Sequence, residues 1–222
     1  MQCSRIFRAV AIATTLFVGA CAGQQVEQDD AAARGLATDT ARGEVAARRR
    51  PVPPESLPPA RRPRADMRLE VDLAARELRV YRGDELAGTY GVAVGTAEWP
   101  TRKGDWLVSQ VVWNPEWNPP DESWADTAER KAPGAPDNPL GEAQLIYDPP
   151  RTIHGTNVPS SIGKAASHGS IRMRNAEIVQ LARRIMEVAG VERDEAFYRS
   201  VRENRTEKVI IDLPKVVPIS VQ

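Results

Sequence analysis

The sequence predicts a mainly β fold, a curved sandwich of short strands with one or two packed helices. Between Met67 and Leu73, apolar residues alternate with polar or charged ones, and the alternation returns after turns further along the chain. This pattern is typical of strands that bury one face. Only the segment from Asn175 to Gly190 places apolar residues at helical spacing over a long stretch. No internal repeat is present.

The individual elements follow from the same two periodicities. The expected strands are residues 67–73, 78–80, 90–94, 106–111, 151–154, 209–213 and 216–221, and Ala143, Leu145 and Tyr147 lead into the strand at 151–154. Pro218 is expected to break the last of them, because proline cannot donate a ladder hydrogen bond. Asn175 is expected to cap the long helix and Gly190 to end it. Residues 194–203 are expected to form a second, short helix.

The composition excludes several classes of protein. The chain has 222 residues and no net formal charge, so nothing indicates a nucleic acid or another strongly charged partner. A mean hydropathy of −0.42 excludes a polytopic membrane protein. The length suits one domain with attachments.

The N-terminus has the pattern of a secretory signal. Arg5 and Arg8 precede an apolar run over residues 9–20 that is too short to span a bilayer. The run ends in small residues before Cys21, which resembles a bacterial lipoprotein box. Residues 1–20 are therefore expected to be a lipoprotein signal peptide, with Cys21 lipidated and the mature protein anchored in the periplasm. Ala22, in place of aspartate, favours the outer membrane over the inner one. An ordinary signal peptide cut after Ala20 is the alternative.

Residues 21–66 are expected to form a disordered tether rich in arginine and proline. Large apolar side chains are few, so the segment cannot offset the entropy of ordering. Its proline-rich half is expected to be extended and to lift the domain, residues 67–222, off the membrane. The alternative is that the arginines bind anionic lipid or wall polymer.

Candidate chemistry is concentrated in residues 153–175. The only two histidines of the chain, His154 and His168, lie here; each precedes a glycine, and the second His-Gly runs into Ser170. A hydroxyl nucleophile needs a base that can take a proton at neutral pH, and histidine can serve. Glycine allows backbone N–H groups to approach a reacting oxygen. The stretch is thus a candidate site with a nucleophile and a base.

Metal and disulfide chemistry are not expected. Cys3 lies in the segment to be removed, so the folded part contains no thiol. Two histidines without an acidic pair at ligand spacing give little support for a metal. No metal and no other cofactor is predicted.

A long irregular segment is the second candidate feature. All five tryptophans fall between Trp99 and Trp124, and residues 113–139 are too irregular to be core. Loops of this length in compact domains are usually functional or mobile, so the segment is expected to be a lid over an extended peptide. The alternative, compatible with the first, is that Trp106 and Trp113 are core while Trp117 and Trp124 line a groove.

Residues 153–175 also resemble the signature of the YkuD-like L,D-transpeptidase catalytic domain. That signature is His-Gly-Thr, a spacer ending in glycine, and then Ser-His-Gly-Cys, an apolar residue and arginine. The matching residues are His154, Gly155, Thr156, Gly163, Ser167, His168, Gly169, Ile171 and Arg172. One position differs, because Ser170 stands where the family has its nucleophilic cysteine. The resemblance covers residues 67–221 and implies a YkuD-like curved β-sandwich.

The resemblance implies acyl transfer on peptidoglycan stem peptides. By position, His154 would be the base and Ser170 the nucleophile, with the Gly155 carbonyl orienting the imidazole. The N–H groups of Gly169 and Ser170, together with His168, would form an oxyanion hole. The implied substrate-binding residues are Arg172, Thr156, Trp117 and Tyr147. Arg172 would hold a substrate carboxylate or, alternatively, form a structural salt bridge.

Ser170 leaves three explanations open. It is a true serine nucleophile, or the domain is a pseudoenzyme that still binds wall peptide, or the serine is an introduced change. A serine hydroxyl is far more basic than a thiol and therefore needs an accurately placed base. The predicted function is an L,D-transpeptidase-like acyl transfer, with a catalytically impaired, peptidoglycan-binding lipoprotein as the alternative.

Overall fold

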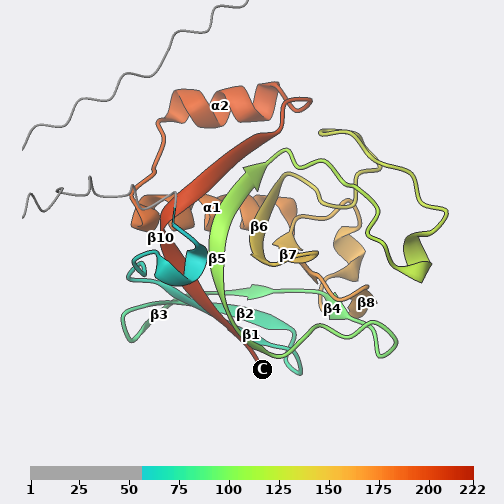
Figure 1. Cartoon of the computed structure of the whole chain (residues 1–222), viewed down its shortest axis with the longest axis horizontal. Helices are drawn as coiled ribbons and strands as arrows, with labels where there is room; N and C mark the ends of the chain where they lie inside the picture. The colour runs from blue at the N-terminus through green and yellow to red at the C-terminus, as the bar shows by residue number, and fades with distance from the viewer. Residues whose placement is uncertain (1–56) are drawn as a thin grey trace, which may run out of the picture. The chain divides into compact units, whose positions relative to one another are not determined.

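The computed structural model describes residues 57–222 (Figure 1). The predicted signal peptide, Cys21 and most of the predicted tether lie outside the described residues. Within them the prediction of a mainly β fold is confirmed. An eight-stranded curled sheet has the order β3-β2-β1-β10-β5-β6-β7-β9, and β4 and β8 form a second, two-stranded sheet. Two α-helices within residues 57–222 accompany the sheets.

The bounds of the elements agree with most of the predicted periodicities, but the strand expected over residues 90–94 is wrong, because β3 ends at Gly91 and Val94 begins the separate strand β4. The strands are β1 (Arg68–Asp72), β2 (Glu77–Arg82), β3 (Glu85–Gly91), β4 (Val94–Gly95), β5 (Gly104–Trp113), β6 (Ala143–Asp148), β7 (Arg151–His154), β8 (Ala165–Ser167), β9 (Ile171–Arg172) and β10 (Val209–Val221). The helices are α1 (Asn175–Ala189) and α2 (Glu195–Glu203), and the short 3₁₀ turns are η2 (Pro59–Arg61), η3 (Ser123–Ala125) and η4 (Pro159–Ser161). None of the helices within residues 57–222 is long and apolar enough to cross a bilayer.

Strand β10 corrects the predicted C-terminal end. Residues 209–213 and 216–221 were expected to be separate strands, but they form one strand of 13 residues. The strand pairs antiparallel with β5 along both halves, and the register shifts between Asp212 and Val217. Its last residues also pair in parallel with β1. The break expected at Pro218 does not occur, because the shift lies before this residue and Pro218 is paired with Leu107. Strand β10 lies between β1 and β5 in the sheet.

The boundary between tether and domain is also corrected. Residues 57–66 were assigned to the tether, yet they pack on the domain. The backbone of Ala65 donates to Val216, and Val216 donates to Pro63. The largely buried Arg62 side chain donates to the carbonyls of Ser109 and Leu213. The folded unit therefore begins before Met67.

Helix α1 covers one face of the sheet behind β10, β5 and β6 (Figure 1). Its buried side chains are Ile178, Leu181, Ala182, Ile185, Met186 and Ala189. Gly190 ends the helix in the left-handed conformation, as predicted, with φ of 80°. The predicted cap is wrong, because Asn175 is the first helical residue and its side chain bonds elsewhere. Asp194 caps α2 by accepting from the N–H of Phe197.

Candidate active site

The site is built on two neighbouring parallel strands. In the pairing of β7 with β9, Ile153 lies opposite Ile171, and His154 lies opposite Arg172. Both isoleucines are fully buried in the core. Since side chains alternate across a sheet, His154 and Arg172 point to the other face. Ser170, directly before β9, is on the same face as Arg172.

That other face opens on a cavity of about 440 Å³. His154, Ser170 and Arg172 all line it. The remaining walls come from the long loop, β6, the start of β7 and the turn before β9: Glu116, Trp117, Asn118, Pro120, Glu122, Trp124, Pro139, Leu140, Gln144, Pro150, Arg151, Thr152, Ser167 and His168. The pairing of β7 with β9 thus brings the two candidate catalytic side chains, 16 residues apart in sequence, to one cavity.

The imidazole of His154 is oriented by the next residue. His154 is only 4% exposed, and its Nδ1 lies 2.6 Å from the carbonyl oxygen of Gly155. A carbonyl can only accept, so Nδ1 carries the hydrogen in this contact. Nε2 is then the nitrogen that can take a proton.

Burial sets the protonation state of His154. It lowers the pKa of the imidazole from 6.5 to about 4, since the charged form loses its hydration. The Gly155 carbonyl and the backbone of Pro139 act in the opposite direction, and the charge of Arg172 adds to the lowering. The imidazole is therefore neutral near pH 7 and has the form that a base requires.

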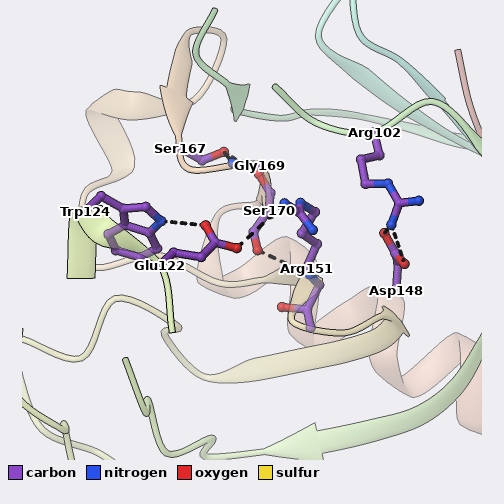
Figure 2. Close-up of polar contacts among 9 residues, drawn as sticks. Arg102, Glu122, Trp124, Asp148, Arg151, Ser167, Gly169 and Ser170 are labelled. Carbon is purple, nitrogen blue, oxygen red and sulfur yellow. Dashed lines mark hydrogen bonds and ion pairs between the residues drawn. The ribbon is translucent and has the colours of Figure 1, made fainter. Parts of the chain in front are cut away.

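Ser170 is anchored to the strand that carries His154. The backbone N–H of Thr152 donates to Ser170 Oγ at 3.2 Å, and the hydroxyl of Ser167 donates to the Ser170 carbonyl (Figure 2). No hydrogen bond joins Ser170 to His154, although both line the cavity. Such contacts are often long without substrate and close only when it binds.

The turn before Ser170 holds the residues expected at the oxyanion hole. The N–H of Gly169 donates to Ser167 Oγ at 3.3 Å, so it is engaged within the turn. Gly169 has φ of +100°, a conformation that side chains rarely adopt. The exposed ring of His168 stacks on Trp124, with centroids 4.0 Å apart and planes 7° apart. In this structure His168 joins the turn to the long loop.

Arg172 has no acidic partner among residues 57–222. Its guanidinium forms no ion pair with them, and its buried Nε has no hydrogen-bond partner. Burial lowers the pKa of the group. The structural salt bridge considered from the sequence is thus absent from the described part of the chain, and the cation faces the cavity.

Comparison with known proteins places these features in a family. The model of the L,D-transpeptidase catalytic domain, YkuD, matches residues 66–211. The chain belongs to the YkuD family. YkuD of Bacillus licheniformis, which is named as an L,D-transpeptidase, is 36% identical over 115 residues, 52% of this chain and 58% of its own length. YqjB of Bacillus subtilis, named likewise, is 34% identical over 117 residues, 50% of this chain and 61% of its own.

The chain thus spans about three fifths of these curated relatives. A solved structure of an L,D-transpeptidase from Mycobacterium smegmatis aligns with 71% of this chain and with 59% of its own chain. The TM-score is 0.46 and the sequence identity is 13%. Membership of the YkuD family rests on the family model, which matches residues 66–211.

Thr156 has a different place in this YkuD domain from the one expected. It is 2% exposed and does not line the cavity. Its N–H donates to Asn175 Oδ1 at 3.1 Å, and the N–H of Glu142 donates to the same oxygen at 3.2 Å. Asn175 therefore fastens the segment after His154 to the turn before β6. A Cβ on Gly155 or Gly141 would lie 2.1 Å from that oxygen, which explains why both are glycine.

Tyr147 is corrected as well. Expected to form a groove wall, it is 7% exposed, belongs to the hydrophobic core and packs edge-to-face on Trp106. Its position follows from alternation along β6, whose buried residues are Ala143, Leu145 and Tyr147. Trp117 and Trp124 do line the cavity of the YkuD domain, whereas Trp113 is buried in the core.

The long loop is fastened at both ends by buried asparagines. The amide of Asn114 donates to carbonyls around the end of α2, at Val201, Asn204 and Glu207. The amide of Asn138 donates to Pro115 and Ala132, and its side-chain oxygen accepts from the N–H of Leu140. The loop that carries Trp117 and Trp124 over the cavity therefore has a defined base.

Three polar residues near the cavity were missed from the sequence. Arg151 and Glu122 line it, and Asn175 positions the loop behind it. The sequence did contain a signal for Arg151, because this residue begins the strand that ends in His154. Glu122 gives no local signal, since its place depends on the path of the long loop. Among residues 57–222 no group of three metal-ligating side chains is present.

Proposed function

We propose that this YkuD-family protein transfers acyl groups of peptidoglycan stem peptides, with His154 as base and Ser170 as nucleophile. The observation that carries the proposal is that both side chains, one at the end of β7 and the other directly before the adjacent parallel strand β9, open on one cavity. The neutral state of the buried imidazole supports it further, because a serine nucleophile needs a base that is already unprotonated.

The chemistry would proceed in two steps. Ser170 Oγ attacks the carbonyl carbon of an L-centre that is followed by a D-residue, while its proton passes to His154 Nε2. The C–N bond then breaks, and the leaving D-residue takes that proton on its amine. An acceptor amine or water next attacks the ester, its proton passes to His154, and the proton returns to Ser170 Oγ as the C–O bond breaks.

Backbone donors near Ser170 would stabilise the oxyanion in both steps. The N–H of Gly169 would have to exchange Ser167 Oγ for the substrate oxygen, and their separation of 3.3 Å makes the existing bond a long one. Arg172, without an acidic partner among the described residues, would hold a substrate carboxylate. Trp117 would supply an apolar wall.

The second candidate function is binding of wall peptide without turnover. It is favoured by the absence of a hydrogen bond between His154 and Ser170, and by the Thr152 N–H that holds Ser170 Oγ. A site shaped for the larger sulfur atom would leave the serine oxygen short of its carbonyl, and a misplacement of about 1 Å can cost about 100-fold in rate.

Mass spectrometry of the products from a disaccharide-tetrapeptide distinguishes the two functions. We expect the wild-type protein to release the terminal D-alanine slowly and Ser170→Ala and His154→Gln to release none. Ser160→Ala is the matched control, because Ser160 is an exposed serine of the same segment and does not line the cavity.

Release by Ser170→Cys together with none by the wild type would refute serine catalysis and favour the binding function. If Ser170→Ala retains the release rate of the wild type, Ser170 is not the nucleophile. Purified sacculi provide the complementary test, since the binding function requires that the protein sediment with them.

We also propose that the mature protein is anchored by a lipid at Cys21 in the periplasm, facing the wall. The support is the sequence before Cys21 alone. Cys21→Ala is expected to abolish incorporation of labelled palmitate and to release the protein from the membrane fraction. Incorporation that persists in this variant would contradict the anchor.

A further inference from the structure

Arg151 is the second cation at the cavity and is incompletely bonded. It begins β7, three residues before His154. Its buried Nε has no hydrogen-bond partner among residues 57–222, and its only ion-pair partner among them is Glu122, at 3.7 Å from Nη2. A guanidinium has five N–H donors, and each buried donor without an acceptor is costly. Arg151 therefore has donors available to a ligand in the cavity.

Arg151 also lies against the turn that presents Ser170. A Cβ built on Gly169 would be 3.0 Å from Arg151 Nε, so the guanidinium packs on the Gly169 backbone. Figure 2 shows Arg151 next to Ser170, and the Glu122 carboxylate reaches towards Arg151 from the side on which Ser170 lies. Since Arg172 follows Ser170 by two residues on the same face, the candidate nucleophile is flanked by two guanidinium groups.

Glu122 comes from the long loop and is held by two contacts. One oxygen accepts from Trp124 Nε1 at 2.8 Å, and the other faces Arg151 (Figure 2). Trp124 in turn stacks on His168. The carboxylate thus enters the cavity from the loop, at the end of a series of contacts that joins the loop to the turn before Ser170.

The charges at the cavity do not balance within the described residues. Glu116 also lines the cavity, but it pairs with Arg130 and Lys208. In the described part of the chain, Glu122 is then the one cavity carboxylate available to the two guanidinium groups, and it makes only a long contact with one of them. This arrangement has room for one more anionic group.

We propose that Arg151 and Arg172 form a carboxylate-binding subsite beside Ser170, and that Glu122 occupies the Arg151 half until a substrate carboxylate displaces it. Guanidinium groups bind carboxylates through paired, charge-assisted hydrogen bonds, which the 3.7 Å contact with Glu122 does not provide. A ligand that makes such bonds would exchange a weak partner for a stronger one. The displaced Glu122 would carry Trp124 and the loop with it.

The inference rests on the proposed function and names a residue that would select its substrate. The ligand would be a peptide with a free carboxylate on the D-residue that follows the L-centre. Amidated peptides would bind more weakly, because an amide cannot satisfy two cations. Arg151 is thus assigned to the selection of substrate and not to proton transfer.

The probe is diacetyl-L-lysyl-D-alanine, compared with its C-terminal amide. Dissociation constants are measured by calorimetry in a Ser170→Ala background, so that neither peptide is consumed. Since hydrogen bonds to charged groups exceed neutral ones, we expect the acid to bind about tenfold more tightly than the amide. Arg151→Gln should reduce that preference about fivefold or more, and Arg151→Lys should retain part of it.

Arg102→Gln is the matched control. Arg102 is an exposed arginine that pairs with Asp148 at 3.3 Å and does not line the cavity (Figure 2). It should keep the full preference for the acid. Glu122→Gln, which retains an acceptor for Trp124, should tighten binding of the acid and leave that of the amide nearly unchanged.

Equal binding of acid and amide, or an unchanged preference in Arg151→Gln, overturns the subsite. An unchanged affinity for the acid in Glu122→Gln overturns the displacement of Glu122. Release of D-alanine by the wild-type protein without a preference for the acid would refute the subsite and leave the proposed function standing. A preference for the acid without any release would support the subsite and refute turnover. Absence of binding by both peptides would refute both.

Discussion

The backbone N–H of Thr152 donates a hydrogen bond to Ser170 Oγ at 3.2 Å. Thr152 belongs to β7, the strand that ends in His154. One short strand therefore holds both the candidate base and the oxygen of the candidate nucleophile. Because the oxygen accepts this bond, the hydroxyl hydrogen is left to donate to another group, as proton transfer to His154 would require.

The acid limb of the rate profile should lie near pH 4. The base must be neutral to act, and burial lowers the pKa of His154 from 6.5 to about 4. If the wild-type protein releases D-alanine, kcat/KM is expected to stay level from pH 8 down to about pH 5 and to fall below that. The measurement is the initial rate of release at low substrate concentration. An acid limb centred near pH 6.5 would contradict a buried, neutral base.

Stability should also depend on His154 in acid. In the unfolded chain the imidazole binds a proton near pH 6.5, whereas in the folded state it does so only near pH 4. The unfolded state thus binds more protons between these values, so stability falls as the pH falls from 6.5 towards 4 and is level above 6.5. At about 1.4 kcal/mol per pKa unit, the loss is of the order of 3 kcal/mol.

Urea unfolding at pH 7.5 and at pH 4.5 measures this loss. His154→Gln should show a smaller difference between the two pH values than the wild type. His168→Gln is the control: burial also lowers the pKa of His168, but its ring is exposed, so its contribution should be smaller. Identical pH dependence in wild type and His154→Gln would argue against the prediction.

Gly155→Ala should disrupt the support of the base. The new Cβ would lie 2.1 Å from Asn175 Oδ1, so the Asn175 contacts or the loop must move. Such crowding typically costs about 1–3 kcal/mol of unfolding free energy. Gly91→Ala is the matched control, because the new Cβ at residue 91 would make an ordinary 3.5 Å contact with Ile162. Thermal unfolding of both variants is the measurement, and equal melting temperatures would show that the loop adapts freely.

Asn175→Ala should weaken the same support without crowding it. The variant leaves the N–H groups of Glu142 and Thr156 without their acceptor. Each unsatisfied buried donor costs about 1–3 kcal/mol. Asn175→Asp keeps an acceptor at the first turn of α1, where negative charge is favourable, and should remain close to the wild type. Chemical denaturation compares the three proteins. If Asn175→Ala is as stable as Asn175→Asp, the two bonds contribute little.

Local patterns account for the parts of the fold that could be predicted. Alternation located β1 and β2, and helical spacing with a terminal glycine located α1 up to Gly190. Alternation along the chain also indicates that Tyr147 is buried, since Tyr147 lies on the same face of β6 as Leu145. The prediction of a groove wall followed the family resemblance instead. These features depend on residues close together in the chain, whose periodicity is visible in any window.

The remaining features depend on which distant segments pair. Strand β10 is continuous because β5 lies beside it along both halves, and residues 57–66 are ordered against Val216. The side chain of Asn175 bonds to the turns at Glu142 and Thr156 instead of capping its own helix. Such contacts join groups far apart in sequence, and no local propensity encodes them.

The candidate site divides in the same way. The residue types at His154 and Ser170, and the strand that ends at His154, could be predicted from the sequence. Their common cavity required the parallel pairing of β7 with β9, and the meeting of Glu122 with Arg151 required the path of a long loop. Side-chain chemistry is a property of each residue, but the separation between two groups is set by the packing of the whole domain. Only the tertiary structure could therefore place a carboxylate of the loop against the cation beside Ser170.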